Sequence, residues 1–253
     1  MLFRNCISIL LIFGTPLLVL GCGFSPDLWC SSPEISEKCG VEKQCSLWHS
    51  KQALTDVPLV HYELYYESLC PGCKQLILTQ LYPAWLKVQS IVNVTLVPYG
   101  NAQEREYGSK WYFTCQHGPA ECVGNLVETC ILSILPFDKA FPFIHCLEMY
   151  NPSTDGKYCA SMFNLSSEWP SIEECSTGPM GNYLEHNMAV KTNALNPPHQ
   201  YVPWVVLNGV HNEEIQNKAA SDSLALICNA YQGVKPAGCT KTGFKRSPVK
   251  RIF

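Results

Sequence analysis

The stretch LVHYELYYESLCPGCKQLILTQL, residues 59–81, decides the fold. Its first part, residues 59–66, is rich in aromatic and β-branched side chains, which predicts a strand. Its last part carries apolar residues at helical spacing, which predicts a helix. The C-P-G-C motif of residues 70–73 stands between them. The sequence therefore predicts a cysteine pair at the start of a helix that directly follows a strand.

That position favours thiol chemistry. The unpaired N–H groups and the dipole of a helix N-terminus stabilise a thiolate. Pro71 suits the first helical position, because its fixed φ and missing N–H cost nothing there. We assign Cys70 as the attacking thiolate and Cys73 as the resolving thiol of a thiol–disulfide exchange. Glu67 and Lys74 flank the motif and are interpreted as ordinary solvated charges.

Two other interpretations of a C-x-x-C pair stay open at this point. In the first, the pair is half of a zinc site, and in the second it is one part of a disulfide scaffold. A zinc site needs further ligands, and the spacing of Cys115, His117 and Cys122 is not that of a zinc finger or ribbon. No metal is therefore assigned, and His117 is given a structural role in its loop.

The sequence that follows the cysteine motif predicts a thioredoxin-like α/β fold with a helical insertion, rich in disulfides. The helix after the cysteine pair should continue through a kink at Pro83. The other predicted elements are a strand at 91–99, a mainly helical segment at 124–190, a strand with a turn and another strand at 201–210, and an apolar helix at 221–231.

The dipeptide Val202-Pro203 supplies a second site element. A proline beside a buried strand is unfavourable unless its peptide bond is cis or the strand begins there. In thioredoxin-like domains a cis-proline faces the redox pair and exposes backbone polar groups to substrate. We therefore predict that Val202 and Pro203 bind substrate, with an ordinary trans-proline as the alternative.

Cysteine usage indicates the compartment. Fifteen cysteines in 253 residues suit an oxidising environment better than the cytosol. Eight of them are candidates for structural disulfides of the main domain, and spacing does not select among about 105 pairings. They are Cys115, Cys122, Cys130, Cys146, Cys159, Cys175, Cys228 and Cys239.

The N-terminus predicts entry into the secretory pathway. Residues 1–21 have the pattern of a signal peptide, and their interrupted apolar run is too short for a comfortable membrane span. A membrane anchor and a lipoprotein site at Cys22 are the alternatives. Asn93 and Asn164 begin glycosylation sequons, which fit a eukaryotic secretory route. No stable membrane insertion is expected.

Three regions follow the signal peptide. Residues 22–57 form a short segment with four cysteines and little apolar periodicity, too small for a core without disulfides. Residues 58–240 form the main domain, and residues 241–253 form a basic tail. The net charge of -3 gives no reason to expect a nucleic-acid partner.

Residues 115–130, CQHGPAECVGNLVETC, match the C-Q-H-G-x-x-E-C-x-x-N-x-x-x-x-C signature. This is the signature of the gamma-interferon-inducible lysosomal thiol reductases (GILT). Residues 94–103 (VTLVPYGNAQ) and 197–205 (PPHQYVPWV) resemble the same family. The resemblance covers residues 58–240.

The resemblance implies reduction of protein disulfides in acidic endosomes and lysosomes, in support of antigen processing, with secretion as a further destination. Its redox pair falls on Cys70 and Cys73. It implies a soluble glycoprotein whose terminal segments are trimmed. Segment 22–57 resembles the saposin A-type motif of propeptides and is interpreted as a removable propeptide. The alternative function for this segment is lipid binding or sorting. The expected partners are disulfide-bonded proteins and a small thiol reductant, without a bound cofactor.

Two departures from the family pattern concern the chemistry. The central dipeptide is Pro71-Gly72, where many relatives carry Gly-Ala or Gly-Gly, so the redox potential is open. The tail lacks a terminal cysteine, which gives no support to a covalent dimer. A free cysteine also titrates near pH 8.5, so acid opposes thiolate attack.

Two other functions compete with reduction. A disulfide oxidase or isomerase shares the fold and differs in redox potential. A disulfide-stapled, lipid-associated binding protein would use its C-x-x-C pair only as structure.

Overall fold

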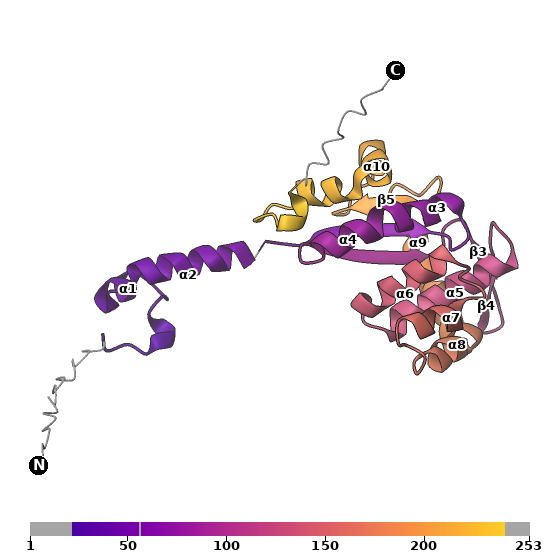
Figure 1. Ribbon diagram of the computed structural model, residues 1–253, viewed down its shortest axis with the longest axis horizontal. Coiled ribbons are helices and arrows are strands. Elements are labelled where there is room, and N and C mark those ends of the chain that lie inside the picture. Colours follow the sequence, from indigo (N-terminus) through magenta and orange to yellow (C-terminus); the bar gives the residue numbers. More distant parts are fainter. Residues whose placement is uncertain (1–21, 56, 241–253) are drawn as a thin grey trace, which may run out of the picture. The chain divides into compact units, whose positions relative to one another are not determined.

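The computed structural model describes residues 22–55 and 57–240 (Figure 1). The predicted signal peptide and basic tail lie outside these residues. The chain divides into two compact units, the first ending at Asp56 and the second beginning at Val57. Within the described part, no helix combines the length and apolar character needed to cross a membrane.

The first unit contains two helices, α1 (Pro33–Cys39) and α2 (Glu42–Thr55), after a 3₁₀ turn at Pro26–Leu28. Ser32 caps α1 by accepting a hydrogen bond from the backbone N–H of Ile35. The disulfides Cys22–Cys39 and Cys30–Cys45 link the segment internally. Cross-links thus take the place of a core that so short a segment cannot bury.

The second unit is built on a three-stranded sheet in the order β2-β1-β5 (Figure 1). Strand β1 (Val60–Tyr66) is parallel to β2 (Val92–Pro98) and antiparallel to β5 (Trp204–Leu207). All four residues of β5 are buried, as are most of β1 and β2. Strand β1 is the central strand, and the cysteine pair follows its C-terminal end.

Helices α3 (Pro71–Leu76) and α4 (Tyr82–Val88) follow β1 and are joined by a π-helical turn at Ile77–Leu81. The turn lets Tyr82 donate to the carbonyl of Ile77, and the helical path continues through Pro83 as predicted. Helix α10 (Glu213–Ala230) packs against α4 and β5. These helices cover the hydrophobic core under the sheet.

The predicted helical insertion is confirmed. It comprises five helices, and α5 packs against α6, α8 and α9 and also against strand β2. The five are α5 (Pro119–Ile134), α6 (Phe137–Met149), α7 (Gly156–Met162), α8 (Trp169–Thr177) and α9 (Pro179–Asn193). The α/β class and the thioredoxin-like order of elements therefore hold.

Three predictions about elements need correction. Strands β3 (Gln103–Tyr107) and β4 (Lys110–Thr114) form a hairpin that was not predicted, because both strands are mostly exposed and lack apolar alternation. The second strand expected by residue 210 is only a bridge between Leu207 and Val210, since the Asn208-Gly209 turn has positive φ at both residues. The helix predicted at 221–231 is the second half of α10, beyond a non-helical residue at Asp222, whereas the first half, which begins at Glu213 and is capped by Asn212, was not predicted.

Candidate active site

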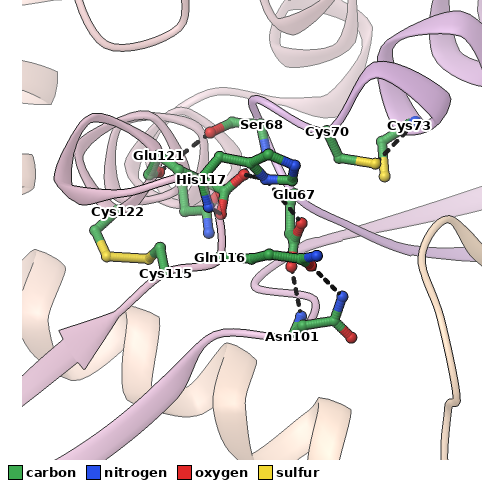
Figure 2. Close-up of polar contacts among 11 residues, drawn as sticks. Glu67, Ser68, Cys70, Cys73, Asn101, Cys115, Gln116, His117, Glu121 and Cys122 are labelled. Atoms are coloured by element: carbon green, nitrogen blue, oxygen red, sulfur yellow. Dashed lines mark hydrogen bonds and ion pairs between the residues drawn. A yellow bond between two sulfur atoms is a disulfide. The ribbon is translucent and has the colours of Figure 1, made fainter.

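Cys70 and Cys73 are the two described cysteines without a disulfide bond. Cys70 is the N-cap of α3, and its sulfur accepts a hydrogen bond from the backbone N–H of Cys73 at 3.4 Å. Pro71 occupies the first helical turn. Cys70 retains 8% exposure and Cys73 none. Both residues are therefore buried, and only Cys70 keeps a small exposed fraction. Figure 2 shows the two side chains side by side at the start of α3.

The two thiols differ in acidity. The side chain of Cys73, as a hydrogen-bond donor, is the main cause that lowers the pKa of Cys70 to about 6, with help from the backbone N–H groups of Cys73 and Gly72 and from His117, against the effect of burial. Burial is the main cause that raises the pKa of Cys73 far above its ordinary value. Cys70 is thus the sulfur that ionises first, as a nucleophile must.

The peptide bond between Val202 and Pro203 is cis. A Cβ atom placed on Gly72 would lie 3.5 Å from Cδ of Pro203, so the proline ring faces the redox motif across a glycine. Gln216 of α10 holds this loop from below by donating to the carbonyl of Pro203 at 2.9 Å and accepting from the backbone N–H of Val205 at 3.0 Å.

Glu67 is not the solvated charge that we predicted, because its side chain is fully buried. Its Oε1 accepts a hydrogen bond from the backbone N–H of Asn101 at 2.8 Å, and its Oε2 lies 3.3 Å from Nδ1 of His117. Burial is the main cause that raises the pKa of Glu67 to about 7. Lys74 is partly exposed and donates from Nζ to the carbonyl of Tyr150.

The loop that begins the cysteine signature lies beside Glu67 (Figure 2). Cys115 and Cys122 form a disulfide, which rules out the zinc ligand set considered above. His117 contacts the buried Glu121 twice, through Nδ1 at 2.5 Å from Oε2 and through its backbone N–H at 3.0 Å from Oε1. The sequence alone did not place His117 near Cys70, because these residues meet only through the tertiary structure.

The same signature also holds the loop before Cys70. The side-chain oxygen of Asn125 accepts from the backbone N–H of Ser68 at 3.0 Å, and Ser68 donates from Oγ to the carbonyl of Glu121 at 3.1 Å. A Cβ on Gly124 would lie 2.4 Å from Oγ of Ser68, so only glycine fits there without a shift. The signature residues of α5 therefore fix the backbone between Glu67 and Cys70.

A second group of buried acids lies near the pair. Tyr66 donates to Oε2 of Glu128 at 2.5 Å, and Glu128 and Glu148 are both fully buried. Burial raises the pKa of both carboxyls, while the charge of Lys74 opposes the rise. Glu148 also interacts electrostatically with Cys73, disfavouring its ionised form. Sequence spacing offered no signal for this group.

The other candidate residues are placed as follows. Asn93 on β2 and Asn164 after α7 are both exposed, so their side chains are open to modification. The eight remaining cysteines of the second unit pair within it as Cys115–Cys122, Cys130–Cys175, Cys146–Cys159 and Cys228–Cys239.

A cysteine pair at a helix N-terminus, with one acidic and one sealed thiol facing a cis-proline, defines a thiol–disulfide oxidoreductase. Comparisons with known proteins narrow this class. Residues 61–163 match the family model for gamma interferon inducible lysosomal thiol reductase (GILT).

Named relatives extend the match over most of the chain. It is 41% identical to a gamma-interferon-inducible lysosomal thiol reductase of Carassius auratus, over 91% of this chain and 89% of that protein. The Mus musculus protein of that name is 42% identical over 83% of each chain. Among solved structures, Chlamydia trachomatis DsbA aligns with a TM-score of 0.44 and 11% identity, over 65% of this chain and 86% of that one.

This chain therefore belongs to the GILT family, as the sequence motifs predicted. It is a thiol–disulfide oxidoreductase.

Proposed function

We propose that the protein reduces disulfide bonds of endocytosed proteins in acidic endosomes and lysosomes, through Cys70 and Cys73, and so supports antigen processing. The observation that carries the proposal is the dithiol pair itself, with an acidic thiol that keeps a small exposed fraction and a fully buried thiol one helical turn further on. Relatives named lysosomal thiol reductases support the compartment.

The reaction needs only sulfur and proton transfers. The Cys70 thiolate attacks one sulfur of a substrate disulfide, and the other substrate sulfur leaves and takes a proton. The Cys73 thiol then loses its proton and attacks the sulfur of Cys70, which releases the second substrate sulfur as a thiol. The enzyme is left with a Cys70–Cys73 disulfide. Two molecules of a small thiol reduce it and leave as their own disulfide, so no bound cofactor is required.

Substrate would bind along the loop that holds the cis-proline. A pocket of about 280 Å³ adjoins the redox motif, and Gly72, Leu76, Tyr201 and Pro203 contribute to its lining. The tyrosine ring and the proline offer apolar surface to a side chain near the substrate cysteine. Val202 and Pro203 offer their backbone to an extended chain. An unfolded substrate reaches such a groove more readily than a folded one.

The central experiment compares wild type with Cys70→Ser and Cys73→Ser in the reduction of a denatured disulfide protein, at acid and neutral pH. Cys70→Ser should abolish reduction and keep the fold. Cys73→Ser should trap the mixed disulfide, because nothing then displaces the substrate from Cys70. Full activity of Cys70→Ser would refute the proposal. Intact function with impaired folding would instead favour the binding protein with a structural C-x-x-C pair.

A disulfide oxidase is the second candidate, and one observation favours it. The low pKa of Cys70 stabilises the dithiol form, and a stabilised dithiol makes a stronger oxidant. Equilibration of the pair with glutathione buffers of known ratio measures this balance. A potential well above that of the glutathione pool would support an oxidase.

Processing and location are tested in a secretory cell line. We propose that residues 1–21 are removed as a signal peptide, that segment 22–57 is a propeptide and that the basic tail 241–253 is trimmed. Cell fractionation and terminal sequencing of the mature protein test both processing and location. Asn93→Gln and Asn164→Gln should each remove one N-glycan, seen as a step in gel mobility that glycosidase treatment abolishes.

A further inference from the structure

Glu67 is the residue on which separate parts of the chain converge beside the redox pair. Asn101 donates its backbone N–H to Oε1 at 2.8 Å, and His117 lies 3.3 Å from Oε2. A Cβ on Gly100 would come within 2.4 Å of Cγ of Glu67, so the β2 end approaches the side chain closely. Glu67 also accepts, at its backbone carbonyl, a hydrogen bond from the N–H of Cys70 at 3.2 Å.

His117 is clamped rather than free to rotate. Its Nδ1 lies 2.5 Å from Glu121 and 3.3 Å from Glu67, and both carboxylates are buried. The Cys115–Cys122 disulfide ties the loop that carries it to the first turn of α5. Figure 2 shows the imidazole between these carboxylates and the start of α3, where Cys70 stands.

The charges around the two groups come from several elements. His117 interacts with Glu121 of α5, with Glu67 of the loop before α3 and with Cys70 itself. Cys70 interacts with His117 and Cys73, and it adds its own charge to the fields at Glu67 and at Glu148 of α6. His117 is the cation of this group, and Glu67 and Glu121 are the two acids that contact its imidazole.

We propose that His117, held between Glu67 and Glu121, is a positioning residue that keeps a positive charge beside Cys70 and so maintains its thiolate in acid, while Glu67 gives up its negative charge there. The proposal rests on Cys70 being the attacking thiol. It assigns a function to the first half of the family signature, which does not itself contain the redox cysteines.

The direction of the charge change supports this role. Burial opposes a charge on His117, but the hydrogen bond and charge of Glu121, together with Glu67 and Cys70, raise the pKa of its imidazole. Burial raises the pKa of Glu67 to about 7. As the pH falls from 8 to 5, Glu67 becomes neutral and His117 becomes fully charged. The sulfur of Cys70 therefore gains a more favourable field as protons begin to compete for it.

The first test measures the ionisation of Cys70 directly, without a reductase assay. The reduced full chain, its C-terminal residues included, is alkylated with iodoacetamide from pH 4.5 to 8.5 in the presence of a chelator, and peptide mapping assigns the product to Cys70. His117→Gln should lower the alkylation rate at pH 5 by about tenfold, the effect of losing one nearby opposite charge. Glu67→Gln should not raise the rate at pH 8, where Cys70 is already ionised, but should move the midpoint of the profile to lower pH, because a negative charge beside the sulfur is removed.

A permanent charge distinguishes electrostatics from packing. His117→Lys should restore much of the rate at pH 5, because the ammonium supplies the charge without the ring. His186→Gln is the matched control, since His186 pairs with Glu104 on the β3 hairpin and should leave the profile unchanged. Circular dichroism and thermal melting report whether each variant is folded.

The second test is the pH profile of kcat/KM for disulfide reduction. His117→Gln should lose its activity mainly on the acid side, whereas the control His186→Gln should keep the wild-type profile. An unchanged alkylation profile in folded His117→Gln would overturn the proposal, as would failure of folded His117→Lys to restore the rate. If His117→Gln does not fold, the alkylation profiles of His117→Lys and Glu67→Gln decide. A rate at pH 5 far below that of wild type in folded His117→Lys, or an unchanged profile in folded Glu67→Gln, would then overturn the proposal. Activity in Cys70→Ser would instead refute the proposed function, a separate result.

Discussion

The side chain of Gln216 holds the substrate loop by two hydrogen bonds, one of them a 2.9 Å bond from its Nε2 to the carbonyl of Pro203. Its Oε1 accepts from the N–H of Val205 at 3.0 Å, and the side chain is 8% exposed. Helix α10, which is distant in sequence from the redox motif, thereby positions the cis-proline relative to that motif.

Replacing Gln216 should damage binding more than chemistry. Gln216→Leu leaves two polar backbone groups of the loop without partners, at a cost of about 2 kcal/mol. We expect a several-fold higher KM for a disulfide peptide and lower stability towards urea. Gln216→Glu retains the acceptor for Val205 and loses the donor to Pro203, so its effect should be intermediate. Equal KM values in wild type and the Leu variant would contradict this role.

The side chain at position 72 should control access to the groove. A Cβ there lies 3.5 Å from Pro203 and 4.0 Å from the sulfur of Cys70, which is ordinary contact. Gly72→Ala should therefore change kcat/KM by no more than about twofold. Gly72→Val adds methyl groups towards the pocket and should lower kcat/KM for protein substrates about tenfold. A small disulfide, assayed in parallel, should show less discrimination if access is the cause.

Buried carboxyls should make the fold more stable in acid than at neutral pH. Burial raises the pKa of Glu185 to about 8 and that of Glu128 to about 7. In the unfolded chain such groups titrate near 4.3. Above that pH the unfolded state loses its protons first. The stability that these carboxyls contribute is therefore complete below about pH 4 and falls as the pH rises through 7 and 8.

Urea unfolding at pH 5 and pH 8 measures this dependence. Wild type should have the higher free energy of unfolding at pH 5, with each unit of pKa displacement corresponding to about 1.4 kcal/mol. Glu185→Gln cannot titrate and should reduce the difference, while the exposed Glu173→Gln should not. Greater stability of wild type at pH 8 would contradict the prediction.

The disulfide that spans the insertion should matter most for stability. Cys130–Cys175 links residues 45 apart and joins α5 to α8, whereas Cys228–Cys239 spans 11. Chain-entropy arguments give losses of about 4 and about 3 kcal/mol for their removal. Paired Cys→Ser variants, compared by non-reducing urea unfolding, test the order. A larger loss from the C-terminal bridge would reverse it.

Local sequence was enough to predict the redox element. The strand before Cys70, the proline in the first helical turn and the helix after it are all determined by residues close to one another in the chain. The helical insertion was predicted for the same reason. The signature at 115–130 predicted the family, although its spacing says nothing of what the residues touch.

Element boundaries failed where local patterns are weak. The β3–β4 hairpin is exposed along both strands, so no apolar alternation marks it. Cysteine pairing was also open, because every pairing is compatible with spacing alone.

The charge of Glu67 shows most clearly what only the tertiary structure decided. In the sequence it is one acidic residue beside a motif. In the fold it is buried under Asn101 and His117, which lie 34 and 50 residues further along the chain. Burial and neighbouring charges, which are properties of the assembled fold, determine whether a carboxyl is charged. The chain's local pattern therefore determined where the sulfurs lie, and its tertiary contacts determined the electrostatic field in which they react.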